Sequence, residues 1–156
     1  QAHFALDNYE EAARAFTTSL ERLPSGREAA YNLAIISWYY LEDGPRALEA
    51  LRIAIPLYPR HHKLHALASV VAGLQGEHEE SHPYLIRARE LSGPTPSLDL
   101  QLAELVDLKQ HGKGKLAFER AQLLLEEIPE ANHPMLITEL RRAQLLPMKS
   151  NINTLD

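Results

Sequence analysis

The chain has 156 residues, of which 45% are apolar and 24% charged, a balance typical of globular rather than disordered chains. It contains no Cys, which excludes disulfide bonds and zinc or iron–sulfur sites with Cys ligands. The formal net charge of −5 argues against a nucleic acid as the main partner. No segment approaches the roughly 18 consecutive apolar residues that a membrane span requires, so we expect no membrane insertion.

Four segments of the sequence end alike, at Pro24, Pro59, Gly93 and Pro129, which are 35, 34 and 36 residues apart. Within each segment, apolar residues recur at steps of three and four, which predicts amphipathic helices. Gly and Pro residues between these stretches indicate turns, and the residue before a Pro is disfavoured in a helix. The sequence therefore predicts a pair of antiparallel helices in every 34 to 36 residues.

The four predicted units span residues 1–26, 27–60, 61–95 and 96–131. In the first unit, only Gln1–Leu6 would remain of the first helix before a turn. A helix over residues 133–147 would cap the last unit, because the ends of a repeat array need a polar outer surface. Arg141 and Arg142 of that helix would face water. Residues 148–156 show no periodicity, and we expect them to form a tail.

The repeated pattern resembles the tetratricopeptide repeat over about residues 1–130. The resemblance is carried by Asn8-Tyr9-Glu10-Glu11-Ala12 with Phe16 and Pro24; by Tyr31-Asn32-Leu33-Ala34 with Ala47, Leu51, Ala54 and Tyr58-Pro59; by Gly76-Glu77-His78-Glu79-Glu80 with Ala88; and, more weakly, by Gly112, Ala117, Ala121 and Pro129. It implies an all-α, right-handed solenoid of about four antiparallel helix pairs plus a C-terminal capping helix. It also places Ala34 and Ala47 where two helices cross closely. Because the chain does not begin with Met, we expect a fragment of a larger repeat protein.

Two segments depart from the repeat pattern. Asp43-Gly44-Pro45 carries one extra residue, and Ser81 with Pro83 replaces the usual Ala-rich start of a second helix. The second departure overlaps His78-Glu79-Glu80-Ser81-His82, which matches the H-E-x-x-H sequence of zinc metalloproteases. That chemistry needs both imidazoles on one helical face. The motif falls at a predicted turn and Pro83 disfavours helical geometry at His82, so we expect a polar helix start and no metal site.

A second histidine cluster consists of His61, His62 and His65. A helix that starts here would align His61 with His65, and the pair could then bind a metal. The other interpretations are a solvated helix start, which we favour, and a pH-sensitive or partner-contacting patch. The sequence also lacks a nucleophile motif, and Gly112-Lys113-Gly114-Lys115 is too short for a phosphate-binding loop. We therefore predict no catalytic residues, no enzymatic activity and no cofactor.

Four aromatic residues lie on one predicted helix, and three of them, Trp38, Tyr39 and Tyr40, are consecutive. They cannot all face the core, because neighbours on a helix diverge by about 100°. The resemblance implies that the first helices of the units line a concave groove. The implied groove residues are Glu28, Tyr31, Asn32, Ile35, Trp38, Tyr39, Lys63, Ala66, Val70, Gly73 and Leu74. Tyr and Trp are favoured binding anchors, although these aromatic residues could instead pack between units.

The sequence thus predicts a non-catalytic scaffold that binds a peptide or helix of a protein partner in its groove. One subfamily of these repeats clamps the C-terminal carboxylate of heat-shock chaperones with Lys, Asn and Arg. Asn32 and Lys63 occupy two of the clamp positions, but Leu67 stands where the clamp needs Arg. The alternatives are self-assembly into a homo-oligomer through exposed terminal repeats, and an accessory region of a larger secretion or assembly protein or of an enzyme. No feature of the sequence indicates a compartment.

Overall fold

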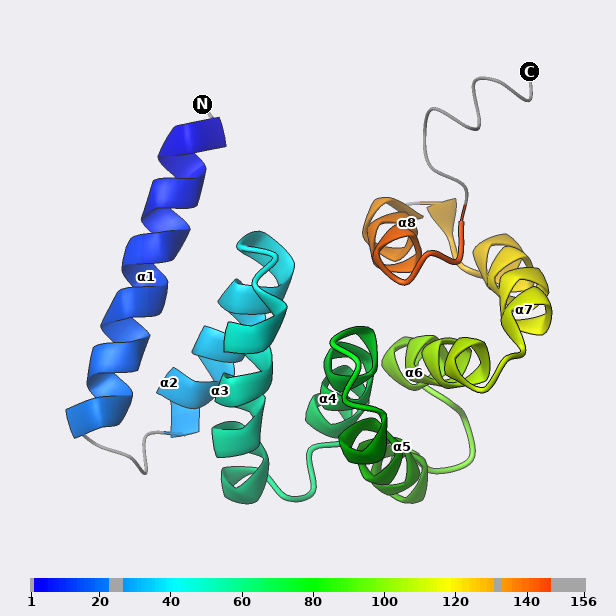
Figure 1. Ribbon diagram of the computed structural model, residues 1–156, viewed down its shortest axis with the longest axis horizontal. Coiled ribbons are helices and arrows are strands. Elements are labelled where there is room, and N and C mark those ends of the chain that lie inside the picture. The colour runs from blue at the N-terminus through cyan, green and yellow to red at the C-terminus, as the bar shows by residue number, and fades with distance from the viewer. Residues whose placement is uncertain (1, 23–26, 131–132, 147–156) are drawn as a thin grey trace.

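The computed structural model describes residues 2–22, 27–130 and 133–146 (Figure 1). Over these ranges the chain is helical with no strand, which confirms the predicted all-α class. The elements are α1 (Ala2–Arg22), α2 (Arg27–Ile35), the π-helical turn η1 (Ile36–Tyr40), α3 (Gly44–Leu57), α4 (His62–Leu74), α5 (His78–Ser92), α6 (Leu98–Gln110), α7 (Gly114–Glu127) and α8 (His133–Arg142). None of the described helices combines the length and apolarity needed to cross a membrane. The predicted tail lies outside the described residues.

Helices that are neighbours in the sequence are also neighbours in space. α2 packs on α3, α4 on α5 and α6 on α7, and α4 also contacts α6. Together the helices trace an arc that runs from α1 through α4 and α5 to α7 (Figure 1). α8 lies on the inner side of this arc, near its α7 end. Buried apolar side chains from α1 to α8 form one hydrophobic core, so the arc is held together along its whole length.

Small residues allow the paired helices to approach each other. Ala34 in α2 and Ala47 in α3 are completely buried in the core. A methyl side chain at such a crossing fills the space between two backbones without leaving a void. Ser81 is buried in α5, and its hydroxyl donates a hydrogen bond of 2.7 Å to the carbonyl of Ser69 in α4. The serine that departs from the repeat pattern therefore has its polar group satisfied inside a helix pair.

The chain widens into a π-helical turn at the end of the first helix of the second predicted unit. In η1 the amide of Leu41 donates to the carbonyl of Ile36, five residues earlier, over 3.0 Å. Because a π-turn holds more residues than the α-turn that it replaces, it can take up the extra residue of this unit. The turn ends at Glu42, whose φ of 51° is uncommon for a residue other than Gly. Asp43 then caps α3 by accepting a hydrogen bond from the amide of Arg46.

Two predicted helix boundaries are wrong. The turn expected after Leu6 is absent, because α1 runs without interruption through Ala2–Arg22. Asp7 and Asn8 are weaker helix breakers than the Gly and Pro residues that end the other helices. The helix expected over residues 133–147 ends at Arg142, because Gln144 adopts a left-handed conformation with φ 59°. The amide of Leu145 then donates to the carbonyl of Leu140, a bond that closes the helix end.

Gly73 was predicted to line a groove, and the structure gives it a different role. It is buried in α4, and a Cβ atom added there would lie 2.2 Å from Nε2 of Gln110 and 3.1 Å from Cγ1 of Val106. Both neighbours belong to α6. The missing side chain therefore allows α6 to pack closely on α4 instead of widening a binding groove.

Substitution of Gly73 by Leu is expected to lower the free energy of unfolding by about 1–3 kcal/mol, because the larger side chain would separate α4 from α6. The matched control is Gly114→Leu at the start of α7, where an added Cβ meets nothing within 4 Å. We expect the control to stay within about 0.5 kcal/mol of the wild type. Urea denaturation followed by circular dichroism measures both variants. Equal stabilities of the two variants would contradict the close packing inferred at Gly73.

Candidate functional site

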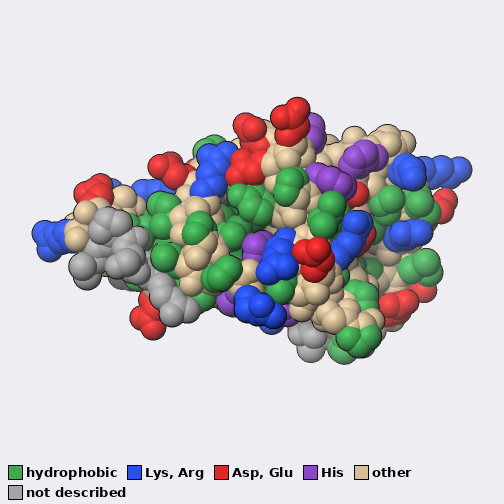
Figure 2. All heavy atoms as spheres, turned by 90° about the horizontal axis from the view of Figure 1, so that it is seen from below, with side chains coloured by type: hydrophobic (Ala, Val, Ile, Leu, Met, Phe, Trp, Pro, Cys, Tyr) green, Lys and Arg blue, Asp and Glu red, His purple; other side chains and the backbone are tan. Residues whose placement is uncertain are grey.

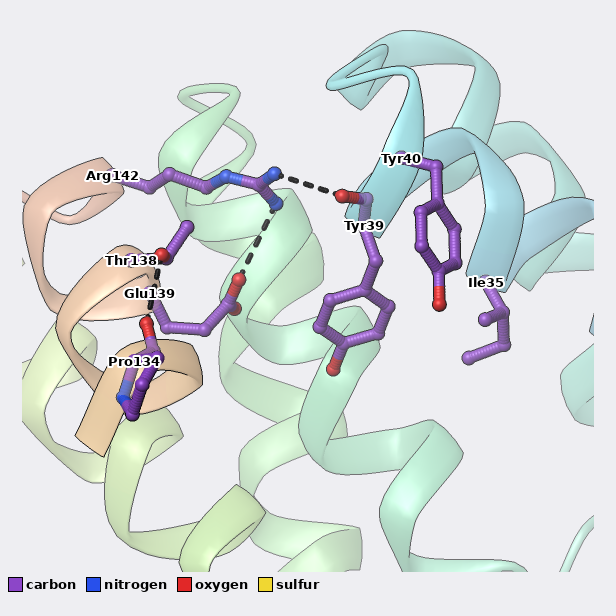
Figure 3. A pocket seen from close by; sticks show the side chains of 7 residues that line it. All are labelled: Ile35, Tyr39, Tyr40, Pro134, Thr138, Glu139 and Arg142. Atoms are coloured by element: carbon purple, nitrogen blue, oxygen red, sulfur yellow. Dashed lines mark hydrogen bonds and ion pairs between the residues drawn. The ribbon is translucent and has the colours of Figure 1, made fainter. Parts of the chain in front are cut away.

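A cleft consists of two neighbouring cavities, a larger one between α2, η1 and α8 and a smaller one between α2, η1, α4 and α6. We call it the aromatic cleft. The larger cavity, of about 540 Å³, is lined by Ile35, Tyr39, Tyr40, Pro134, Thr138, Glu139 and Arg142. The smaller one, of about 140 Å³, is lined by Tyr31, Ile35, Tyr39, Lys63, Leu64, Leu67 and Asp99. Ile35 and Tyr39 line both cavities, so together they form a shared wall. Figure 3 shows the larger cavity, with η1 on one side and α8 on the other.

α8 is fastened to η1 by a group of contacts that we call the clasp, made by Trp38, Glu139 and Arg142. The indole Nε1 of Trp38 donates to Oε2 of Glu139 over 3.1 Å. The guanidinium of Arg142 lies 4.9 Å from the centroid of the Trp38 ring. It also donates to the backbone carbonyls of Trp38 (2.7 Å) and Tyr39 (3.3 Å), and it lies 3.3 Å from Oε1 of Glu139. The clasp therefore joins residues about 100 positions apart in the sequence.

The clasp stabilises the end of η1 for a simple electrostatic reason. The last carbonyl groups of a helix lack intrahelical donors and carry partial negative charge, so a cation is favoured beside them. Arg142 supplies that cation to the carbonyls of Trp38 and Tyr39. Its side chain is only 14% exposed, so the expectation that Arg142 faces water is wrong. The amphipathic pattern of α8 could not reveal this contact, because the partner is a helix end and not an apolar face.

Burial shifts the pKa of two groups that line the cleft, Glu139 and Tyr39. It raises the pKa of the Glu139 carboxyl, against the opposing effects of the Trp38 hydrogen bond and the Arg142 charge. Burial also raises the pKa of the Tyr39 phenol, and the carboxylates of Glu139 and Asp99 raise it further. Tyr39 is therefore a neutral hydroxyl at physiological pH and can donate a hydrogen bond. The wall of the cleft thus offers aromatic surface together with polar donors and acceptors.

The structure divides the predicted groove residues into three groups. Tyr31, Ile35, Tyr39 and Lys63 line the aromatic cleft. Trp38, Ala66, Val70 and Gly73 are buried, so in this conformation they are not accessible to a ligand. Glu28 is exposed, and Asn32 and Leu74 are half-buried, but none of these three lines either cavity.

Several residues of the cleft were not among the predicted groove residues, namely Tyr40, Asp99, Pro134, Thr138, Glu139 and the buried Arg142. Four of them come from α8, which was expected to cap the array and not to reach across to η1. The run Trp38-Tyr39-Tyr40 was the available signal for Tyr40. In the structure Tyr40 stacks on Tyr9 of α1, with ring centroids 4.3 Å apart. The three consecutive aromatic residues therefore contact α8, the cleft and α1, respectively.

The H-E-x-x-H segment forms a polar helix start, as predicted, but it remains helical through His82, where Pro83 was expected to disfavour helical geometry. α5 begins at His78, so His78 and His82 lie one turn apart on the same helix. Pro83 is accommodated within α5, at the loss of one backbone hydrogen bond. Nδ1 of His82 lies 3.8 Å from Oδ1 of Asp107 in α6, and the ring of His111 is close by. In the part of the chain that the structure describes, no group of three His, Asp or Glu side chains is arranged to hold a metal ion.

The second histidine cluster is less exposed than expected. His61 caps α4, and its Nδ1 accepts a hydrogen bond of 3.4 Å from the amide of Leu64. His65 is buried, and its Nε2 lies 3.0 Å from the carbonyl of Pro59. The favoured interpretation of a solvated helix start is therefore wrong for His65. Burial lowers the pKa of His65, and the charge of Arg87 lowers it further, against the opposing effect of the Pro59 carbonyl.

His65 should make the stability of the protein depend on pH. Because its pKa is lower in the folded than in the unfolded state, the unfolded chain binds the proton more readily below about pH 6.5. The free energy of unfolding should therefore fall as the pH drops from 7.5 to 5.5. The variant His65→Gln cannot titrate, so we expect a smaller fall. Urea denaturation at both pH values tests this. An equal fall in the free energy of unfolding for the wild type and His65→Gln would contradict the role assigned to His65.

The surface opposite the cleft shows no dominant charge. Figure 2, which views the molecule from below, shows acidic and basic side chains interspersed with apolar ones over this face. Such a mixed surface lacks the continuous basic patch typical of nucleic-acid binding.

Comparisons with known proteins found no matching family model, no matching curated protein and no matching solved structure. The geometry of the aromatic cleft is therefore the basis for a functional proposal.

Proposed function

We propose that the chain is a non-catalytic scaffold whose aromatic cleft binds a peptide or helix of a protein partner. The observation that supports this proposal is the shared wall of Ile35 and Tyr39 between two neighbouring cavities. Tyr31 adds an aromatic side chain to the smaller cavity, and Tyr40 adds one to the larger cavity. Tyrosine is favoured at binding surfaces because it combines a large apolar area with a hydroxyl and loses little conformational entropy.

In this proposal the helix pairs form a right-handed solenoid of the tetratricopeptide type. The regular spacing of the pairs and the contacts of α4 with both α5 and α6 support it. Each pair leaves an apolar face that only a neighbouring pair can cover, so the array curves and presents a concave surface. The inner side of the arc in Figure 1 is where such a surface would lie, and the cleft opens next to α8 on that side.

The proposal is tested with peptides selected from a random displayed library for binding to the full chain. Substitution of Tyr39 by Ala is expected to weaken a selected peptide at least tenfold, about 1.4 kcal/mol, because both cavities lose their shared aromatic wall. Isothermal titration calorimetry provides the dissociation constants.

The matched control for this test is Ile53→Ala in α3, a large side chain that is exposed outside the cleft. We expect this variant to bind the peptide as tightly as the wild type. Selected peptides that lose affinity with Ile53→Ala and not with Tyr39→Ala would place the binding surface elsewhere and contradict the proposal. Circular dichroism of each variant confirms that the helices are retained.

A second candidate function, self-association, is favoured by one observation. α7 exposes Leu116, Phe118 and Leu123, the last of them to 55%. Leu116 and Leu123 are seven positions apart and therefore lie on one face of α7, and exposed apolar side chains that share a face often indicate a contact surface. If α7 joins two copies, substitution of Leu123 by Glu should convert a dimer into a monomer. Sedimentation velocity over a dilution series measures this, and a wild-type protein that is monomeric at every concentration excludes the second candidate.

A further inference from the structure

α8 is attached to the rest of the chain by two different faces. Its apolar face carries Leu136 and Leu140, which are almost completely buried in the core. The end of α8 is held to α6 by Lys109, whose Nζ donates to the carbonyl of Ala143 over 2.7 Å. Its other face carries Glu139 and Arg142, and these make the clasp with η1. The contact with η1 is thus polar, in contrast to the apolar contact with the core.

The polar contact is incompletely packed. The cavity of about 540 Å³ lies directly between η1 and α8, lined by Tyr39 and Tyr40 on one side and Thr138 on the other. Nε of Arg142 is buried and makes no hydrogen bond to any described residue, and it lies 3.6 Å from Oε1 of Glu42. A buried ion pair recovers little net stability after desolvation, and a cavity forfeits dispersion contacts. The contact of α8 with η1 therefore adds little net stability beyond the apolar contact of α8 with the core.

The surface of η1 that meets α8 has features that select a particular kind of helix. The carbonyls of Trp38 and Tyr39 require a donor, and the Trp38 indole requires an acceptor. A helix provides both when Glu and Arg stand three residues apart on one face, as Glu139 and Arg142 do. The large cavity offers further space for an apolar side chain beside the pair. A partner helix with an apolar side chain that fills this cavity would bury more apolar surface than α8 does.

We propose that this surface of η1 is a docking site for a partner's amphipathic helix that carries a Glu-x-x-Arg pair, and that α8 occupies the site until the partner displaces it. The inference rests on the proposed function, because it identifies the occupant of the same cleft. The partner's Arg would donate to the carbonyls at the end of η1, and the partner's Glu would accept from the Trp38 indole. These two complementary charged groups specify the partner. α8 and the partner cannot occupy the site at the same time. α8 therefore lowers the apparent affinity of the site for the partner.

The single Trp of the chain makes a direct test possible, because Trp38 is at the centre of the clasp. The probe is a synthetic peptide of residues 133–146, which contains neither Trp nor Tyr, so fluorescence reports only on the protein. In the full chain, Glu139→Ala with Arg142→Ala is expected to shift the emission of Trp38 to longer wavelength, because α8 leaves the indole. Addition of the peptide should shift the emission back.

The peptide should bind the double variant at least tenfold more tightly than the wild type. In the wild type, α8 competes at an effective concentration on the order of millimolar for a tethered segment. A control peptide with Ala in place of Glu139 and Arg142 should not bind. The control protein is Glu119→Ala with Arg120→Ala, which removes an exposed Glu and Arg from α7, and it should behave as the wild type does.

Two results would overturn the inference. An unchanged Trp38 emission in the double variant would show that the core alone holds α8 against η1. Equal binding of the two peptides would show that the Glu-x-x-Arg pair is not recognised. If circular dichroism shows that the double variant has lost its helices, Arg142→Lys replaces it, because an ammonium group retains the charge and cannot bridge both carbonyls. If one of these results overturns the inference but the selected library peptides still lose affinity with Tyr39→Ala, the proposed function remains supported.

Discussion

The unsatisfied carbonyl groups at the end of the helix formed by α2 and η1 impose the constraint that shapes the aromatic cleft. A wide π-turn leaves carbonyl groups that no donor of the same helix reaches, and a buried carbonyl without a donor is costly. Here the carbonyls of Trp38 and Tyr39 are satisfied by the guanidinium of Arg142, about 100 residues later in the chain. Together with the burial of Leu136 and Leu140 in the core, this contact places α8 against η1, where it covers Trp38 and forms one wall of the aromatic cleft.

The two attachments of α8 differ in their physical nature, and this difference connects stability with function. Burial of Leu136 and Leu140 provides the non-directional hydrophobic term that holds the helix to the core. The clasp adds directional hydrogen bonds and charge, but it desolvates Glu139 and Arg142 and leaves a cavity. A scaffold that binds a helix needs a surface of this second kind, because directional groups discriminate between partners while a loosely packed contact can be exchanged.

The three consecutive aromatic residues of η1 show how one short turn serves several purposes. Trp38 points to α8, Tyr39 lines both cavities, and Tyr40 stacks on Tyr9 of α1. Neighbouring residues on a helix necessarily face different directions, so one turn can contact three elements at once. The turn thereby connects α1 and α8 to the cleft. A ligand in the cleft would contact Tyr39, which lies between the residue that contacts α8 and the residue that contacts α1.

The helical class, the spacing of the helix pairs and the small residues at their crossings could all be predicted from the sequence. These are local properties, because helical periodicity, Gly and Pro positions and residue size act within a few residues. The sequence also indicated Tyr31, Ile35, Tyr39 and Lys63 as members of one surface. Only the tertiary structure decided that Trp38 is buried, that Gly73 serves close packing and that Arg142 lies inside the molecule. Each of these depends on which distant element arrives at the residue, and no local pattern records the position of a helix about 100 residues away.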